Sequence, residues 1–243
     1  MDRAKIRLFV EDDLTEGAVL SLAAQAHYLT NVMRAQVGGL VALFNGRDGE
    51  WTARLVEAGK RRVTAECIGQ AVQQSLPPDL WLLFAPIKKA RTDFIVEKAT
   101  EMGVRRIQPV FTRYTNSERV RPEKLQAHCI EAAEQCGSVF VPELVAPAPL
   151  DRMLDQWPQD RRLMFCDETA AGMDALGALK SAGGEKWAIV IGPEGGFAPE
   201  EAERLRGIAQ TLAVSLGPRI LRADTAAVAA MTLWQMALGD WRV

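Results

Sequence analysis

The 243-residue sequence has few of the residues that mark redox, hydrolytic or metal sites. It contains two histidines and four cysteines, and the cysteines show neither the close spacing of zinc ligands nor the density of a small disulfide-bonded secreted domain. We therefore expect no metal ion and a reducing compartment, the cytoplasm.

Charge of one sign is also lacking. The 29 Lys and Arg residues against 31 Asp and Glu residues give a net charge of -2, so any surface that binds a polyanion must be local. No apolar run reaches the roughly 20 residues that a membrane span needs, and the first ten residues alternate charged and apolar side chains, unlike a secretion signal. A hydrophobic fraction of 48% indicates a soluble globular protein.

Three common site motifs are missing as well. No two glycines are separated by one residue, which excludes the dinucleotide fingerprint, and there is no Walker loop or G-x-S-x-G elbow. The two histidines, His27 and His128, fall on predicted helices. A histidine-based hydrolase therefore has little to work with.

The first seventy residues predict short strands. Leu40–Phe44 and Trp51–Val56 flank Asn-Gly and Asp-Gly pairs and form a predicted hairpin, Val63–Ile68 a further strand and His27–Arg34 a short helix. We expect a small β-rich barrel over residues 1–72. Pro77-Pro78 continues neither a helix nor a central strand and marks the domain boundary.

From residue 78 to residue 243 the pattern changes to strands that alternate with helices, which predicts an α/β domain with a mainly parallel sheet. The expected strands are Leu80–Pro86, Val104–Phe111, Leu163–Cys166, Trp187–Ile191 and Leu212–Leu216, and the expected helices are Thr92–Met102, Pro122–Gly137 and Ala223–Gly239. The Pro-Ala alternation over 146–149 predicts a loop. Because ligands bind beyond the carboxyl ends of parallel strands, the loops after Cys166, Ile191 and Leu216 are the candidate site.

Two of these loops have unusual sequences. Gly192–Phe197 contains paired glycines that let the backbone approach a ligand closely, although a plain strand-to-helix turn would look the same. In Leu216–Thr225, Ile220 and Leu221 suit the wall of an adenine or sugar site. Arg222 is either functional or a surface ion-pair partner of the nearby Asp224.

Together these two loops resemble the RsmE-type 16S rRNA uridine-N3 methyltransferases of the SPOUT class. The resemblance rests on Ile-Gly-Pro-Glu-Gly-Gly at 191–196 and Leu-Gly-Pro-Arg-Ile-Leu-Arg at 216–222. Further matching segments extend it over nearly the whole chain: His27-Tyr28-Leu29, Val32-Met33-Arg34, Phe44-Asn45-Gly46, Glu97–Val104 and Glu131–Gly137.

The resemblance implies an N-terminal PUA-like barrel that binds RNA and a C-terminal SPOUT α/β domain with a trefoil knot. It further implies S-adenosylmethionine as the cofactor, 16S rRNA or the small ribosomal subunit as the partner, and a homodimer. The apolar helix over Ala226–Leu238 is a candidate contributor to the dimer, and ordinary core packing is the alternative for most of its residues. The implied cofactor contacts are Phe165, Ile191, Gly192, Pro193, Glu194, Gly195, Gly196, Leu216, Gly217, Arg219, Ile220, Leu221 and Thr225.

The reaction requires that N3 of uracil lose its proton, so the site must stabilise an anion. We expect Arg222 to do so beside the uracil oxygens, with Arg113 as the second candidate. The proton acceptor stays open between Glu194 and Asp224. The sulfonium of the cofactor already activates the methyl group, and no metal is needed.

The RNA surface is expected where positive charge gathers. Between Lys88 and Arg121 there are nine basic residues against four acidic ones, and a second basic cluster lies in the barrel. The predicted RNA contacts are Arg3, Arg7, Arg34, Lys60, Arg61, Lys88, Lys89, Arg91 and Arg119.

Two departures from the family pattern affect these expectations. Arg113-Tyr114 stands where relatives commonly have Glu-Arg after the strand, so no active-site glutamate is carried over there. Ser138 stands where relatives often carry an arginine, which removes one phosphate contact or leaves it to a neighbour such as Arg119.

Two other functions remain open from the sequence alone. One is a SPOUT methyltransferase that modifies another RNA atom or a tRNA. The other is a non-catalytic RNA-binding adaptor, which would have no need for a close-approach glycine loop opposite an arginine loop.

Overall fold

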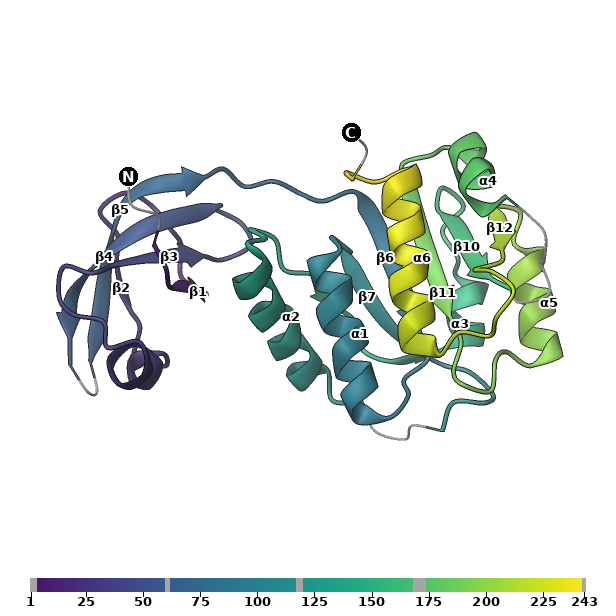
Figure 1. The fold of residues 1–243 in the computed structure, drawn as a ribbon, viewed down its shortest axis with the longest axis horizontal. Coiled ribbons are helices and arrows are strands. Elements are labelled where there is room, and N and C mark those ends of the chain that lie inside the picture. The colour runs from purple at the N-terminus through teal and green to yellow at the C-terminus, as the bar shows by residue number, and fades with distance from the viewer. Residues whose placement is uncertain (1–3, 60–61, 117–119, 168–173, 242–243) are drawn as a thin grey trace. The chain divides into compact units, whose positions relative to one another are not determined.

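The computed structural model describes residues 4–59, 62–116, 120–167 and 174–241, and the chain divides into two compact units (Figure 1). The first unit comprises Met1–Leu76 together with Ala133–Val141, and the second comprises Pro77–Ala132 and Pro142–Val243. Within the described ranges, no helix has both the length and the apolar character needed to cross a membrane.

The first unit contains a five-stranded sheet in the order β1-β3-β4-β5-β2. Its strands are β1 (Arg7–Phe9), β2 (Val19–Ser21), β3 (Leu40–Phe44), β4 (Glu50–Ala58) and β5 (Val63–Val72). β1 pairs with β3 in parallel and the other pairs are antiparallel, with register shifts between β4 and β5. Such bulges bend strands, and the sheet encloses a core that includes Leu22, Leu43 and Leu55.

The predicted helix over 27–34 is a π-helix, η1 (Tyr28–Val32). It ends at Val32, and Arg34 beyond it has a φ of 51°, the only positive value of a residue other than glycine in the described part of the chain. A side chain in this left-handed region costs about 1–2 kcal/mol. Arg34 therefore stands at a position where glycine is the usual residue.

A distant segment completes the first unit. Ala133–Val141, the end of α2 (Pro122–Cys136) and the turn after it, packs with this unit. The Arg7 guanidinium donates hydrogen bonds to the carbonyl oxygens of Ala133 and Ser138, the latter at 2.6 Å. The Phe9 amide donates to Glu134 Oε1 at 2.8 Å.

The second unit is built on a parallel sheet in the order β12-β10-β11-β6-β7-β8, with β9 paired to β7. Its strands are β6 (Asp79–Phe84), β7 (Arg106–Phe111), β8 (Glu143–Leu144), β9 (Ala148–Pro149), β10 (Arg162–Cys166), β11 (Lys186–Ile191) and β12 (Thr211–Val214). Its helices besides α2 are α1 (Lys89–Glu101), α3 (Leu150–Asp155), α4 (Ala175–Ala182), α5 (Pro199–Gly207) and α6 (Ala223–Ala237). α1 and α6 lie side by side over the sheet (Figure 1), while α3 and α5 pack against Leu83, Phe165 and Val190.

The predicted strand and helix alternation is confirmed. Gly103 (φ 72°) and Gly137 (φ 81°) follow α1 and α2, as their positions in the sequence predict. The expectation of a plain loop over 146–149 is wrong, because Ala148 and Pro149 pair with the end of β7.

Candidate active site

A cavity of about 440 Å³ lies beyond the carboxyl ends of β10, β11 and β12. It brings together most of the predicted cofactor contacts, which come from three separate segments: Phe165, Ile191, Gly192, Pro193, Glu194, Gly196, Leu216, Gly217, Arg219, Ile220 and Leu221. Gly195 and Thr225 are not among the lining residues. The parallel sheet explains the convergence, because all three loops leave the same edge.

The glycine loop after β11 is shaped by a close aromatic contact. A Cβ atom on Gly192 would lie 2.8 Å from Cε2 of Phe197, closer than side chains tolerate. The Phe197 ring meets the Phe165 ring edge-on at 5.5 Å between centroids. Gly196, with φ 71°, donates its amide to the Pro193 carbonyl at 2.9 Å and closes the turn. The sequence Gly-Pro-Glu-Gly-Gly-Phe thus forms a tight wall of the cavity.

The loop after β12 supplies another part of the cavity wall. Ile220 is 87% exposed, an unusual state for an isoleucine at the edge of a cavity. Arg222 also lines the cavity and is exposed, and its side chain makes no hydrogen bond or ion pair with any residue that the structure describes. It is therefore available to an anionic ligand.

Arg91 joins the two loops. Its Nη1 lies 2.9 Å from Glu194 Oε1, and its Nε lies 3.7 Å from Asp224 Oδ2. The alternative reading of Arg222 as the ion-pair partner of Asp224 is thus wrong, because Asp224 faces Arg91. The phosphate contact of Arg91 stays a prediction, and two carboxylates already lie beside its guanidinium.

The second catalytic candidate, Arg113, does not line the cavity. Its turn is nevertheless tied to the glycine loop. Glu201 is 8% exposed, and its carboxylate accepts one hydrogen bond from the Arg113 amide at 2.8 Å and one from the Ala198 amide at 2.9 Å. A Cβ atom on Gly195 would lie 3.4 Å from Tyr114 Cβ, which places the two loops in contact.

Nine of the lining residues were not predicted as site residues, among them Cys166, Asp167 and Arg206. Asp167 follows β10 and accepts a hydrogen bond from Arg206 Nε at 2.8 Å, and the Arg206 guanidinium lies 5.8 Å from the centroid of the Phe165 ring. The position of Asp167 directly after a strand was the available signal. Burial raises the pKa of Cys166 to about 12, which favours the neutral thiol over the thiolate.

The predicted RNA contacts differ in their exposure and in their partners. Arg7 is half-buried, pairs with Glu50 at 2.5 Å and lies 3.8 Å from the Phe44 ring centroid, so its side chain already has partners within the first unit, and its RNA contact stays a prediction. Lys89 pairs with Asp93 at 2.5 Å, whereas Lys88 and Arg34 are exposed. The others lie outside the described residues: Arg3, Lys60, Arg61 and Arg119.

Ser138, one of the two departures from the family pattern, has local hydrogen-bond partners. Ser138 Oγ donates to the Phe140 carbonyl at 2.8 Å and accepts from the Phe140 amide at 3.1 Å, which closes the turn after α2. Among the described residues, no group of three or more His, Cys, Asp or Glu side chains could hold a metal ion.

Comparison with known proteins agrees with this geometry. Residues 74–235 match the RNA methyltransferase domain family, and residues 23–67 match the RNA methyltransferase PUA domain. The second match confirms the PUA-like prediction for the first unit.

Individual relatives are similar over most of their length. A ribosomal RNA small subunit methyltransferase E from Rickettsia conorii is 29% identical over 228 residues, 93% of each chain. The Synechocystis protein of the same name is 30% identical and covers 90% of this chain and 73% of its own.

Two solved structures share the fold with the cofactor in place. The small subunit methyltransferase E of Neisseria gonorrhoeae bound to S-adenosyl methionine has a TM-score of 0.86 at 29% identity, with 98% of this chain and 99% of that chain covered. A putative methyltransferase from Legionella pneumophila with bound SAM has a TM-score of 0.85, also at 29% identity, with 98% and 100% covered. The chain therefore belongs to the RNA methyltransferases of the ribosomal RNA small subunit methyltransferase E family.

Proposed function

We propose that this protein transfers a methyl group from S-adenosylmethionine to N3 of a uridine in the 16S rRNA of the small ribosomal subunit. The observation that carries the proposal is the cavity beyond β10, β11 and β12, which is lined both by the glycine loop and by Arg222, whose exposed side chain has no partner among the described residues. The solved relatives with bound S-adenosylmethionine support the choice of cofactor.

The residues that line the cavity suit this cofactor. Its volume of about 440 Å³ falls in the range of roughly 300–1,000 Å³ that is usual for small-molecule sites. Ile191, Leu216 and Leu221 offer apolar surface to an adenine ring, and the exposed Ile220 would lose contact with water when a ligand binds. The glycine loops bring backbone polar groups to the wall.

The chemistry needs an anion-stabilising group more than a nucleophile. Bound S-adenosylmethionine supplies a methyl group that its sulfonium already activates. Arg222 stabilises the negative charge that develops on the uracil oxygens as N3 loses its proton. Arg113, held by Glu201 beside the glycine loop, is the second candidate for this role. Glu194 and Asp224, which share the Arg91 guanidinium, remain the two candidate proton acceptors.

The decisive experiment is mass spectrometry of nucleosides from the rRNA of a deletion strain, with the lost methyl group located by RNase mapping. We expect loss of one N3-methyluridine from 16S rRNA and its return when the wild-type gene is restored. Loss of a different methylated nucleoside, or of one from tRNA, would show a related enzyme with another substrate.

A calorimetric titration separates the enzyme from an RNA-binding adaptor. We expect S-adenosylmethionine to bind with the same affinity in the presence and absence of a chelator. No binding at all would favour the adaptor.

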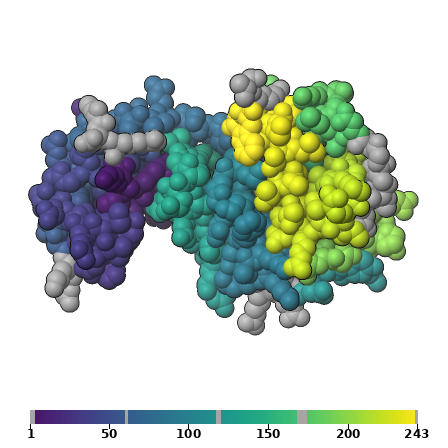
Figure 2. All heavy atoms as spheres, in the orientation of Figure 1, coloured from purple at the N-terminus to yellow at the C-terminus, as the bar shows by residue number. Residues whose placement is uncertain are grey.

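We further infer that the enzyme is a cytoplasmic homodimer with a knotted C-terminal domain. Figure 2 shows α6 uncovered on the surface of the second unit, and Met236 on this helix is 53% exposed. The four cysteines are free thiols, which suits a reducing compartment. Light scattering at micromolar concentration should give the mass of a dimer, and a monomer would contradict this inference.

A further inference from the structure

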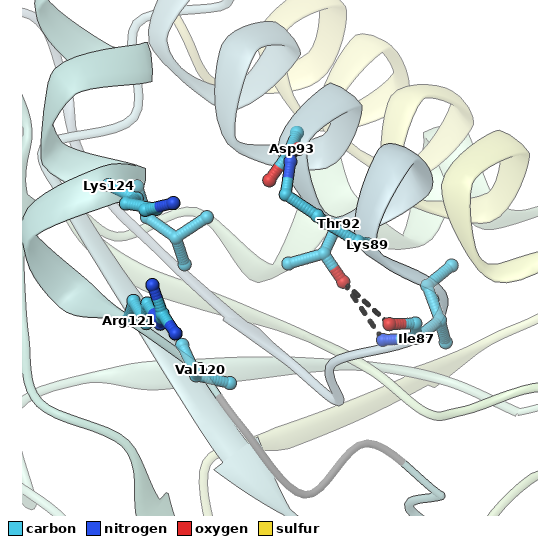
Figure 3. A pocket seen from close by; sticks show the side chains of 8 residues that line it. Ile87, Lys89, Thr92, Asp93, Val120, Arg121 and Lys124 are labelled. Carbon is cyan, nitrogen blue, oxygen red and sulfur yellow. Dashed lines mark hydrogen bonds and ion pairs between the residues drawn. The ribbon is translucent and has the colours of Figure 1, made fainter.

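A second cavity, of about 350 Å³, lies in the second unit between the start of α1 and the start of α2. Its apolar surface comes from Ile87, Val120 and Leu125, of which Ile87 and Leu125 are buried. Thr92 Oγ1 accepts a hydrogen bond from the Ile87 amide at 3.0 Å and donates to the Ile87 carbonyl at 3.1 Å (Figure 3). These bonds fix the loop that enters α1, so this wall of the cavity is formed in advance.

The polar lining of the cavity is mainly positive. Lys89, Arg121 and Lys124 line it, against one carboxylate, Asp93. Asp93 is shared, because Lys89 Nζ lies 2.5 Å from one of its oxygens and His128 Nε2 lies 3.7 Å from the other. Arg121 and Lys124 are exposed and have no hydrogen bond or ion pair with their side chains in the part of the chain that the structure describes. They stand across the cavity from α1 in Figure 3.

The first turn of α1 separates this cavity from the proposed cofactor site. Lys89, Thr92 and Asp93 line the second cavity. Arg91, within the same turn, contacts Glu194 in the wall of the cofactor cavity. The two cavities are therefore neighbours along one edge of the parallel sheet.

We propose that this second cavity, defined by Ile87, Lys89, Asp93, Arg121, Lys124 and Leu125, binds a nucleotide that flanks the target uridine in the RNA strand. A nucleotide combines an anionic phosphate with an apolar base face, the two features that the cavity matches with its unpaired cations and its buried apolar residues. Enzymes that extract one base from a strand commonly grip the adjacent nucleotides. The inference rests on the proposed function and specifies how its substrate is held.

The test compares the full-length wild type with the double variant Arg121→Gln/Lys124→Gln. Binding of a single-stranded RNA oligonucleotide that spans the methylated uridine is followed by fluorescence anisotropy at several salt concentrations. We expect the variant to bind about tenfold more weakly. The slope of log K against log salt should fall by about 1.4, because each lost phosphate contact on a single strand accounts for about 0.7. Calorimetric affinity for S-adenosylmethionine should not change.

The matched control removes the same charge elsewhere in the second unit. Arg152 on α3 and Lys180 on α4 are both exposed and line neither cavity. We expect Arg152→Gln/Lys180→Gln to bind the oligonucleotide almost as the wild type does. Equal losses in the two double variants would overturn the proposal and show a general electrostatic effect.

A phosphate scan locates the contact. Single neutral methylphosphonate linkages are placed on either side of the uridine, one per oligonucleotide. We expect one adjacent linkage to weaken binding by the wild type but not by Arg121→Gln/Lys124→Gln. An equal loss of affinity at every linkage would overturn the proposal. It would also be overturned if the double variant bound the oligonucleotide as tightly as the wild type does, even where uridine 5′-monophosphate competes for binding. Unchanged N3-methyluridine in the 16S rRNA of the deletion strain would instead contradict the proposed function.

Discussion

Replacing Arg91 with methionine removes the guanidinium that joins Glu194 to Asp224 and keeps much of the side-chain volume. The two contacts, at 2.9 and 3.7 Å, involve side chains that are 29%, 50% and 20% exposed, in the order Arg91, Glu194, Asp224. Ion pairs that water reaches in this way contribute about 0.2–1 kcal/mol each. If both contacts hold the cofactor loops in the binding conformation, affinity for S-adenosylmethionine should fall about twofold to thirtyfold.

Isothermal titration with S-adenosylmethionine measures this loss directly. Lys88→Met is the matched control, because Lys88 is exposed and adjacent to α1, and its side chain has no partner among the described residues. We expect Lys88→Met to leave cofactor affinity unchanged and to flatten the salt dependence of RNA binding. An unchanged cofactor affinity of Arg91→Met, together with a flatter salt dependence of its RNA binding, would refute the bridging role. That result would support a contact between Arg91 and an RNA phosphate.

Three further expectations concern other residues. Arg222→Ala should lower single-turnover methyl transfer about a hundredfold or more with little change in cofactor affinity, and Arg222→Lys should restore only part of the rate; turnover near the wild-type value would move the role to Arg113. Arg34→Gly should preserve or raise the melting temperature, because glycine accepts the φ of 51°, while RNA affinity measured by anisotropy falls; unchanged RNA affinity would leave Arg34 without an RNA role. Hydrogen bonds from the Leu14 amide and Asn45 lower the pKa of Asp48 below its ordinary 3.8, so the ionised Asp48 stabilises the fold above that pH, and this stabilisation is lost as the pH falls through the lowered pKa. In urea unfolding between pH 5 and pH 2, the stability of Asp48→Asn should therefore fall less with acid than that of the wild type. Equal acid sensitivity would contradict this contribution.

Residues that end strands and helices explain why the second unit could be predicted. Its strands are apolar runs that end at glycine, proline or polar loops, and its helices end at residues such as Gly103, whose positive φ the backbone there requires. The convergence of two distant loops also followed, because parallel strands present their carboxyl ends at one edge. Both signals lie within short stretches of sequence.

The roles of individual arginines could not be predicted in the same way. Arg7 and Arg91 fall in locally basic stretches, but their acidic partners Glu50 and Glu194 are 43 and 103 residues away. A local charge count does not include such partners. The packing of Ala133–Val141 with the first unit was likewise invisible, because helix α2 runs through the boundary without any break in its pattern.

This discontinuous packing affects how the chain folds while it is being synthesised. The last strand of the first unit ends at Val72, yet the segment that completes the unit ends at Val141, 69 residues later. At roughly 5–20 residues per second, the ribosome needs about 3 to 14 s to add those residues. During that interval the Arg7 guanidinium cannot donate hydrogen bonds to the carbonyl oxygens of Ala133 and Ser138, because those residues have not yet been synthesised. The hydrogen bonds of the first unit are therefore incomplete. A chaperone that binds nascent chains would therefore encounter the first unit before its packing is complete.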